Sequence, residues 1–195
     1  MPGGYEQTLD PFLWRAEKLY PDNEIVARTH EGITRYTYDE YADRTRQLSN
    51  ALDGIGVGEG DRVATFCWNH HRHFETYFSV PNMGAQLHTI NPLLPDEHIS
   101  YIVDNADDRV IFVDPSLAEK LEGAYRGADD EFESVEQFVV MGGEGTAEAT
   151  GLDAVSYEEF VEGEPTEFDA PEISEDQPAG MCYTSGTTGK PKGVE

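Results

Sequence analysis

The chain of 195 residues is long enough for one ordinary domain, and its 39 acidic residues outnumber its 13 lysines and arginines, which gives a formal net charge of −26. This charge argues against nucleic acid as a partner, because no basic stripe is present to neutralise phosphates. No apolar run approaches the roughly 18 residues of a membrane span, and the first residues lack the order of a signal peptide, so a cytoplasmic protein without a transmembrane segment is expected.

The composition is that of a folded domain with an anionic surface. Hydrophobic residues make up only 38% of the chain, but 11% of it is aromatic and several short apolar runs are present, which favours a packed core over disorder. In molar salt the Debye length falls to about 3 Å, and repulsion between surface carboxylates is largely screened. A halophilic protein is therefore a hypothesis.

Short apolar runs alternate with amphipathic segments along the chain. Segment 38–53 spaces its apolar residues three and four apart, with Thr37 available as the N-cap and Gly54 beyond the end, which predicts a helix. Further helices are expected at 72–83, 96–105, 115–126 and 156–161. Strands are expected at 62–67, 85–90, 109–113, 137–141 and 180–184. This alternation predicts an α/β fold with a mainly parallel sheet flanked by helices.

Histidines invite a metal interpretation that the spacing does not support. His70, His71 and His73 cluster, but clustering without suitably spaced partners favours a structural or surface role over a zinc site. His88 is expected to pack and to form hydrogen bonds near a strand end rather than to ionise in catalysis. No metal site is predicted from the histidines.

The cysteines and the acidic runs also have plain structural interpretations. Cys67 and Cys182 lie far apart without a CxxC pattern, so both are expected to be small buried residues rather than a disulfide or a metal site. The acidic runs at 129–131 and 158–159 are expected to be solvated faces.

The end of the chain has a composition that suits a polyanion. Three glycines, five hydroxyl-bearing side chains and two of the four lysines of the protein lie within residues 183–195. Glycine lets backbone N–H groups approach phosphate oxygens closely, and an anionic ligand of so acidic a protein needs a local cationic site. A flexible, solvated end is the alternative for a tail of this composition.

The order of these residues separates them from a Walker A loop. Only two residues lie between Gly186 and Gly189, and a proline follows Lys190. The string Thr184-Ser185-Gly186-Thr187-Thr188-Gly189-Lys190-Pro191-Lys192-Gly193 instead resembles the phosphate-binding motif of the adenylate-forming superfamily, which includes acyl-CoA synthetases, luciferases and the adenylation domains of peptide synthetases. The expected strand at 180–184 would deliver this motif to the carboxyl end of the sheet, where ligands gather in α/β folds.

Most of the remaining chain resembles the medium- and long-chain fatty acyl-CoA synthetase branch. Segments 68–92, 99–102 and 108–114 carry this resemblance, which is less specific because any related sheet needs many of the same residues. Another carboxylate-adenylating enzyme, acting on an aryl or amino acid, stays open as an alternative. So does a non-catalytic anion-binding or interaction remnant.

The resemblance implies an AMP-forming fatty acid–CoA ligase. In the superfamily a carboxylate attacks the α-phosphate of Mg-ATP, giving an acyl adenylate and diphosphate, and coenzyme A then displaces AMP. The implied cofactors are ATP and Mg²⁺, with coenzyme A as cosubstrate and a fatty acid or other carboxylate as substrate; a homo-oligomer stays open. The implied phosphate-binding residues are Thr184, Ser185, Gly186, Thr187, Thr188, Gly189, Lys190 and Lys192. Thr184 is also the implied Mg²⁺ ligand, since a hydroxyl oxygen is a hard ligand.

The predicted fold also indicates an incomplete domain. A loop at the end of a parallel strand should lead into a crossover and further strands, and none is predicted here. Residues 1–195 are therefore expected to be the N-terminal portion of an AMP-binding domain, truncated just after the phosphate-binding loop. The catalytic acid and the adenine and acyl pockets should lie beyond Glu195, so no catalytic residue is expected within the chain, and the isolated chain is expected to be inactive.

Overall fold

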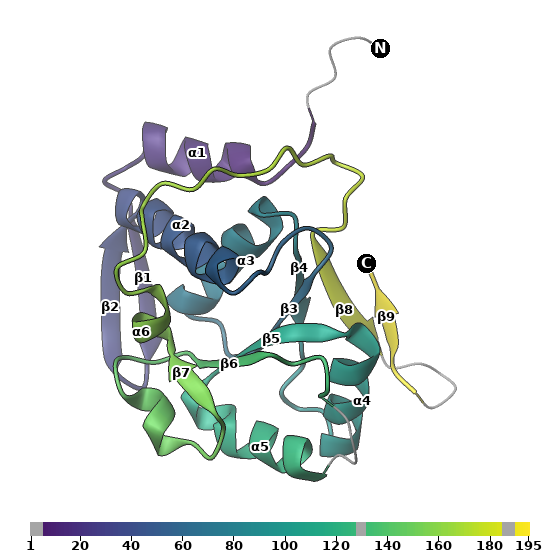
Figure 1. Cartoon of the computed structure of the whole chain (residues 1–195). Coiled ribbons are helices and arrows are strands. Elements are labelled where there is room, and N and C mark those ends of the chain that lie inside the picture. Colours follow the sequence, from purple (N-terminus) through teal and green to yellow (C-terminus); the bar gives the residue numbers. More distant parts are fainter. Residues whose placement is uncertain (1–5, 128–131, 185–189) are drawn as a thin grey trace.

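A computed structural model describes residues 6–127, 132–184 and 190–195 of the chain (Figure 1). The α-helices are α1 (Asp10–Leu19), α2 (Tyr38–Gly54), α3 (His71–Asn82), α4 (Asp96–Ala106), α5 (Ala118–Gly127) and α6 (Tyr157–Val161), with 3₁₀ turns η1 (Pro115–Leu117) and η2 (Thr146–Ala149). The strands are β1 (Glu24–Thr29), β2 (Gly32–Thr37), β3 (Arg62–Phe66), β4 (Gln86–Thr89), β5 (Asp108–Val113), β6 (Gln137–Val140), β7 (Ala154–Ser156), β8 (Gly180–Thr184) and β9 (Lys192–Val194).

The main sheet has seven strands in this part of the chain, in the order β7-β6-β5-β3-β4-β8-β9. Neighbouring strands are parallel except β8 and β9, which pair antiparallel. Helices cover both faces, as predicted for an α/β fold: α2, α3 and α6 pack on one face, and α4 and α5 on the other (Figure 1). The predicted fold class is therefore confirmed.

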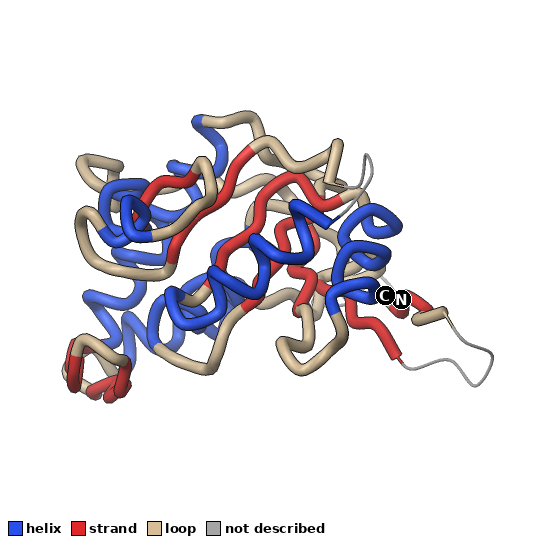
Figure 2. The backbone as a smooth tube through the Cα atoms, turned by 90° about the horizontal axis from the view of Figure 1, so that it is seen from below, coloured by secondary structure: helices blue, strands red, loops and turns tan. Residues whose placement is uncertain are grey.

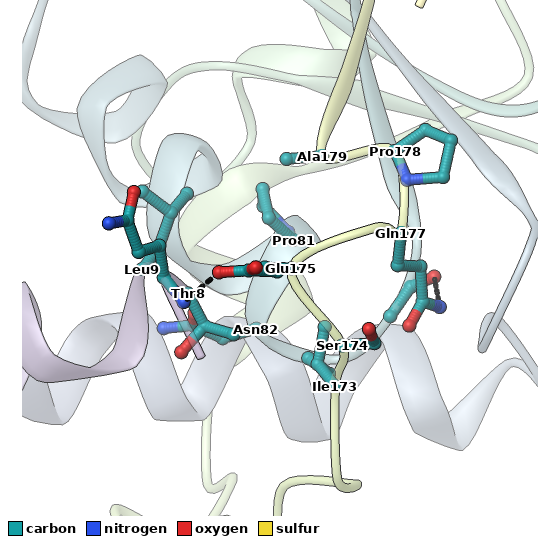
Figure 3. Close-up of a pocket in the computed structure, with 12 residues that line it drawn as sticks. Thr8, Leu9, Pro81, Asn82, Ile173, Ser174, Glu175, Gln177, Pro178 and Ala179 are labelled. Atoms are coloured by element: carbon teal, nitrogen blue, oxygen red, sulfur yellow. Dashed lines mark hydrogen bonds between the residues drawn. The ribbon is translucent and has the colours of Figure 1, made fainter. Parts of the chain in front are cut away.

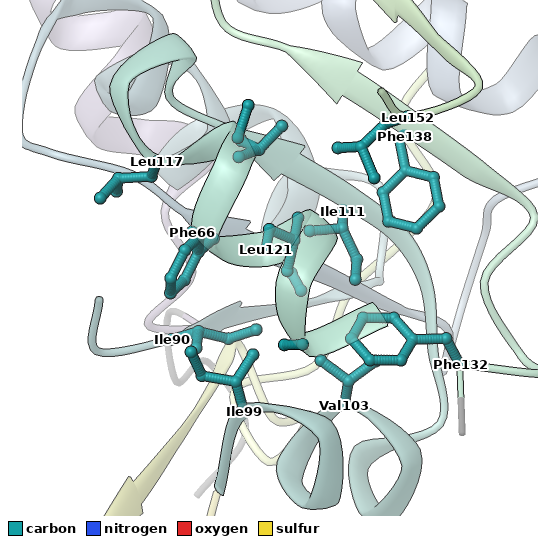
Figure 4. Packing of buried hydrophobic residues seen from close by; sticks show 14 of the residues in the cluster. Phe66, Ile90, Ile99, Val103, Ile111, Leu117, Leu121, Phe132, Phe138 and Leu152 are labelled. Atoms are coloured by element: carbon teal, nitrogen blue, oxygen red, sulfur yellow. The ribbon is translucent and has the colours of Figure 1, made fainter. Parts of the chain in front are cut away.

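Each central strand contributes side chains to two cores. On β3, Val63 faces α2 and α3, whereas Ala64 and Phe66 face α4 and α5 (Figure 4). Successive side chains of a strand point to opposite faces, so a strand covered on both sides needs a continuous apolar run. The apolar runs at β3, β5 and β6 are explained by this double burial.

Helix α2 begins where the sequence predicts. The backbone N–H of Glu40 donates to Thr37 Oγ1 at 3.2 Å, and the Glu40 carboxylate accepts the Thr37 backbone N–H at 2.7 Å. This reciprocal capping box satisfies two donors that a helix N-terminus otherwise leaves without partners. Thr37 is thus the N-cap.

Two hairpins lie at opposite ends of the molecule (Figures 1 and 2). One is the separate β1–β2 pair, for which the sequence analysis predicted no strands. The other is β8–β9, an antiparallel pair whose second strand was not predicted from the sequence. Among the described helices, none is long and apolar enough to pass through a lipid bilayer.

A buried carboxylate joins three elements on the α2 side of the sheet. Glu75 of α3 is fully buried and accepts hydrogen bonds from Tyr36 Oη at 3.1 Å, Tyr157 Oη at 2.5 Å and Arg44 Nε at 2.8 Å. Burial and the neighbouring Glu75 charge raise the pKa of both tyrosines, so both remain protonated donors. A buried charge is tolerated when it is paired and hydrogen-bonded in this way.

Glu158 extends this network and corrects one prediction. It was expected on a solvated face, but it is half-buried and accepts two hydrogen bonds from Arg44 at 3.0 Å and one from Arg72 at 2.7 Å. Burial raises the pKa of Glu158, but the hydrogen bonds and charges of the two arginines outweigh it and lower the pKa. Glu159 is exposed as predicted, whereas the acidic run at 129–131 lies outside the described residues.

Candidate functional site

Strand β8 carries the predicted motif to the carboxyl edge of the sheet. It pairs parallel with β4, with Thr89 opposite Cys182, and its last residue is Thr184. Strand β9 returns beside it, so that Thr184 and Lys192 are direct cross-strand partners. The strand-then-motif context required for a phosphate-binding segment is present.

The structure describes three of the predicted phosphate-binding residues. Thr184, Lys190 and Lys192 are all exposed at this edge of the sheet. Thr184 and Lys192 are brought together by the β8–β9 pairing. The other predicted residues lie outside the described part of the chain: Ser185, Gly186, Thr187, Thr188 and Gly189. The binding role of the whole set stays a prediction.

Tyr183, the residue before the motif, is held from three sides. Its hydroxyl donates to Asn105 Oδ1 of α4 at 2.9 Å, and its ring centroid lies 5.2 Å from that of His88 on β4. A Cβ atom at Gly193 would lie 3.2 Å from Tyr183 Cζ, so glycine at this motif position leaves room for the ring across β9. Tyr183 was not among the site residues predicted from the sequence.

Lys190 contacts the same helix from the other side of the motif. Its Nζ atom lies 4.4 Å from the centroid of the Tyr101 ring, within the range of a cation–π interaction. Tyr101 and Asn105 are four residues apart on α4 and therefore share one face of the helix. The spacing of Tyr101 and Asn105 is visible in the sequence, but the residues that contact them are not.

His88 and Asp108 form a fully buried pair beneath Tyr183. His88 Nδ1 lies 2.8 and 3.0 Å from the two carboxylate oxygens of Asp108. Burial raises the pKa of Asp108, although the hydrogen bond from His88 opposes this shift. His88 packs and forms hydrogen bonds near a strand end, as predicted.

The three clustered histidines serve the fold. His70 Nδ1 accepts the backbone N–H of His73 at 3.3 Å and so caps α3, while His73 Nε2 lies 3.0 Å from Thr65 Oγ1. His71 packs its ring edge against Tyr36, with the ring centroids 5.9 Å apart. Across the described residues, no group of three or more histidine, cysteine or acidic side chains is arranged to hold a metal ion.

One of the two cysteines departs from its prediction. Cys67 is buried as expected, but Cys182 is exposed. Adjacent residues on a strand point to opposite faces, and here Met181 enters the core while Cys182 points to the other face of β8. Both cysteines are free thiols.

A separate pocket lies at the opposite end of β8 (Figure 3). It forms where the segment before β8 crosses the end of α3, and Glu175 there accepts the backbone N–H of Gln7 at 3.0 Å. Gln177 donates to the carbonyl oxygen of Gly84 at 3.2 Å. Because Ala179 and Pro178 line it, this pocket is at the amino end of β8 and is distinct from the predicted phosphate site.

Acidification should destabilise the fold through two of the helix α3 histidines. Burial lowers the pKa of His71 and of His73 from 6.5 to about 4, and nearby Arg72 adds to the effect at His71. Between these pH values the unfolded chain binds more protons than the folded chain, so stability present at neutral pH is lost as the pH falls from 6.5 to 4. The loss is at most about 3 kcal/mol for each histidine.

Urea unfolding between pH 7 and pH 4 measures this loss. His73→Gln should flatten the decline, whereas His30→Gln, at an exposed position, should leave its slope unchanged. Carboxylates with lowered pKa, such as Glu158, add a further loss only below about pH 4.5, so the two windows can be separated. An equal slope in wild type and His73→Gln would contradict the assignment.

The fold of this chain has counterparts among solved structures. The mostly parallel sheet covered by helices on both faces matches the corresponding part of larger enzymes. The Mycobacterium tuberculosis fatty acyl CoA synthetase superposes with a TM-score of 0.79 at 20% identity, covering 96% of this chain and 34% of that one. At this identity the likeness concerns the fold alone.

The sequence assigns the family. The family described as AMP-binding enzyme matches residues 13–195, and the chain belongs to it. The chain is 46% identical over 190 residues to a long-chain-fatty-acid–CoA ligase of Thermus thermophilus, covering 97% of this chain and 33% of that ligase. It is 38% identical over 167 residues to a 3-methylmercaptopropionyl-CoA ligase of Ruegeria pomeroyi, covering 85% of this chain and 30% of that one. The chain thus spans about a third of the length of these curated relatives.

Proposed function

We propose that this chain is the N-terminal portion of an AMP-forming acyl-CoA ligase that activates a fatty acid. The reaction is fatty acid + ATP + CoA to acyl-CoA + AMP + diphosphate, by way of an acyl adenylate. The observation that carries the proposal is the Thr/Gly/Lys motif at the carboxyl end of β8, in a chain of the AMP-binding family. The 195 residues by themselves are proposed to lack ligase activity, with the catalytic acid and the acyl pocket supplied by further chain.

The motif's task in this proposal is to bind the phosphates of ATP. Negative charge builds on diphosphate as it leaves, and donors already aimed at it lower the barrier. Lys190 supplies a cation, Lys192 lies beside Thr184 across the hairpin, and backbone N–H groups and hydroxyls of the motif supply further donors. The formal net charge of −26 makes these local cations necessary, because the rest of the protein repels an anion.

Mg²⁺ fits the site only as an ion held mainly by phosphate oxygens rather than by protein ligands. The exposed Thr184 hydroxyl can serve as one hard oxygen ligand, but the described residues offer no group of three acidic or histidine ligands around it. Mg²⁺ usually keeps several waters and is held through phosphate oxygens and one or two protein ligands. When bound, it would neutralise phosphate charge.

A fatty acid is the proposed substrate, and another carboxylate is the alternative. The Thermus relative is named for long-chain fatty acids, whereas the Ruegeria relative is named for 3-methylmercaptopropionate. The acyl pocket is not part of the described site, so the motif itself cannot distinguish a long-chain fatty acid from another carboxylate substrate.

Pyrophosphate exchange tests the proposed function directly. A longer protein that contains this chain should incorporate labelled diphosphate into ATP only when a suitable carboxylate is present, and should then form acyl-CoA on addition of CoA. Fatty acids of increasing length, 3-methylmercaptopropionate and benzoate should be compared. Exchange with none of them would reject the ligase assignment, and exchange with benzoate alone would reject the fatty acid.

The acidic surface leads to a proposal of halophilic behaviour. Self-repulsion of a chain with charge −26 is screened when the Debye length falls to about 3 Å near 1 M salt. We expect the melting temperature to fall steeply as KCl is diluted from 2 M to 0.05 M. A melting temperature that does not change across this range would reject the proposal.

A further inference from the structure

Helix α4 contacts the chain on both sides of the motif. Asn105 accepts the hydroxyl of Tyr183 at 2.9 Å, and the ring of Tyr101, one turn earlier on the same helix, lies 4.4 Å from Lys190 Nζ. Tyr183 immediately precedes Thr184, and Lys190 is the first lysine of the motif. The two contacts therefore restrain β8 and Lys190 against a single helix face.

The surroundings of Tyr101 allow its ring to contact the Lys190 ammonium group while that group stays exposed to solvent. Its ring is half-buried against the core formed with α4 and α5, so its position is set by packing. Lys190 itself is exposed, so N–H groups of its ammonium that face away from the ring stay accessible to an anion. A cation–π contact at an exposed site is weak, which allows it to restrain the side chain without competing strongly with a phosphate.

Restraint of a lysine has a direct effect on anion binding. A free lysine side chain loses rotamer freedom when it is immobilised. A contact that already limits this freedom in the unliganded protein reduces the entropic cost of binding. The ring of Tyr101 supplies such a contact to Lys190.

We propose that Tyr101 is a positioning residue that orients Lys190 for the phosphates of ATP. This inference rests on the proposed phosphate-binding role of the motif and adds a residue of α4 to it. Tyr101 acts through its ring face and touches no substrate atom. Asn105 serves the same arrangement by fixing Tyr183 at the start of the motif.

Three substitutions separate the ring from the hydroxyl and from general helix packing. Tyr101→Phe keeps the ring, Tyr101→Leu removes it, and Tyr20→Leu removes an exposed tyrosine that lies just after α1. In the 195-residue chain, NMR should show the Lys190 ε-methylene protons shifted upfield by the ring in wild type and in Tyr101→Phe. This shift should be lost in Tyr101→Leu and unaffected in Tyr20→Leu.

Titration of the same proteins with MgATP and with inorganic triphosphate measures the consequence. Tyr101→Leu should weaken binding of both ligands by about two- to fivefold, the size expected of an exposed cation–π contact, while Tyr101→Phe retains the affinity. In a Lys190→Met background, Tyr101→Leu should have no further effect, because the residue acts only through the lysine. A purely structural role would weaken binding in both backgrounds.

The outcomes separate this inference from the proposed function. If the wild-type chain binds neither ligand, the phosphate-site assignment fails and the inference falls with it. If it binds and Tyr101→Leu binds equally well, the inference alone is overturned. Loss of the upfield shift in Tyr101→Phe would also overturn it, since the ring would not be the contact.

Discussion

Lys190→Ala should lower the rate of adenylate formation by about 10²- to 10³-fold in a ligase that contains this chain, the effect seen when one preorganised donor to a developing charge is removed. Lys190 is one of two lysines at the carboxyl edge of β8, in a protein whose net charge otherwise repels ATP. Carboxylate-dependent pyrophosphate exchange gives the rate, and direct titration gives the affinity for the fatty acid. The exchange rate should fall by this factor, while the affinity for the fatty acid stays within about twofold of the wild-type value.

Two companion variants make this result specific. Lys18→Ala removes a remote surface lysine that pairs with Glu17 on α1, and it should leave the exchange rate at the wild-type level. Thr188→Ala removes a motif hydroxyl and should reduce exchange in the same direction as Lys190→Ala. Unchanged exchange in both motif variants would remove the phosphate-binding assignment.

Glu75→Ala should reduce the free energy of unfolding by about 3–5 kcal/mol, as expected when one partner of a buried charge network is deleted. Glu75 is fully buried and binds Arg44, Tyr36 and Tyr157, so its removal leaves buried donors without an acceptor. Urea unfolding at pH 7 measures the loss. Glu148→Ala, on an exposed turn, provides the matched control and should change stability by less than about 0.5 kcal/mol.

A second substitution distinguishes charge from hydrogen bonding at this position. Glu75→Gln keeps an acceptor for one tyrosine hydroxyl but loses the charge that pairs with Arg44. The free energy of unfolding of Glu75→Gln should lie between that of the wild type and that of Glu75→Ala. If Glu75→Ala unfolds with the same midpoint as Glu148→Ala, the network contributes nothing to stability and our account of it is wrong.

The sequence predicts most of the central helices and strands, because the spacing of apolar residues there matches the faces that are buried in the fold. The segments at 38–53 and 180–184 show this: α2 has its capping box at Thr37, and β8 has the predicted bounds. The β1–β2 hairpin was missed, although His30 and Glu31 form the turn between its strands and Gly32, the first residue of β2, has a φ of +129°. The side chains of β1 alternate between exposed and half-buried, and Tyr36 is the one buried residue of β2, so the pair lacks the apolar run that marks the central strands.

The motif could be found from sequence, but its supports could not. Residue order identifies Thr184, Lys190 and Lys192 as candidates, because a phosphate loop needs those residue types close together. Tyr101 and the buried pair beneath Tyr183 come from other strands and helices, and only the fold brings them near. The exposure of Cys182 is similarly set by which face of β8 the helices cover.

The pairing of β8 also determines the order in which the protein can be assembled. Thr89 of β4 and Cys182 of β8 are paired across the sheet but are 93 residues apart in the sequence. The paired strands among β3 to β7 are separated by fewer residues. Contacts of long sequence separation form late, because the entropy of closing the loop must be paid first, and synthesis delivers the N-terminal residues first. A nascent chain can therefore pair β3 to β7 before it presents any residue of the motif, so the proposed phosphate site is among the last parts of the described sheet to form.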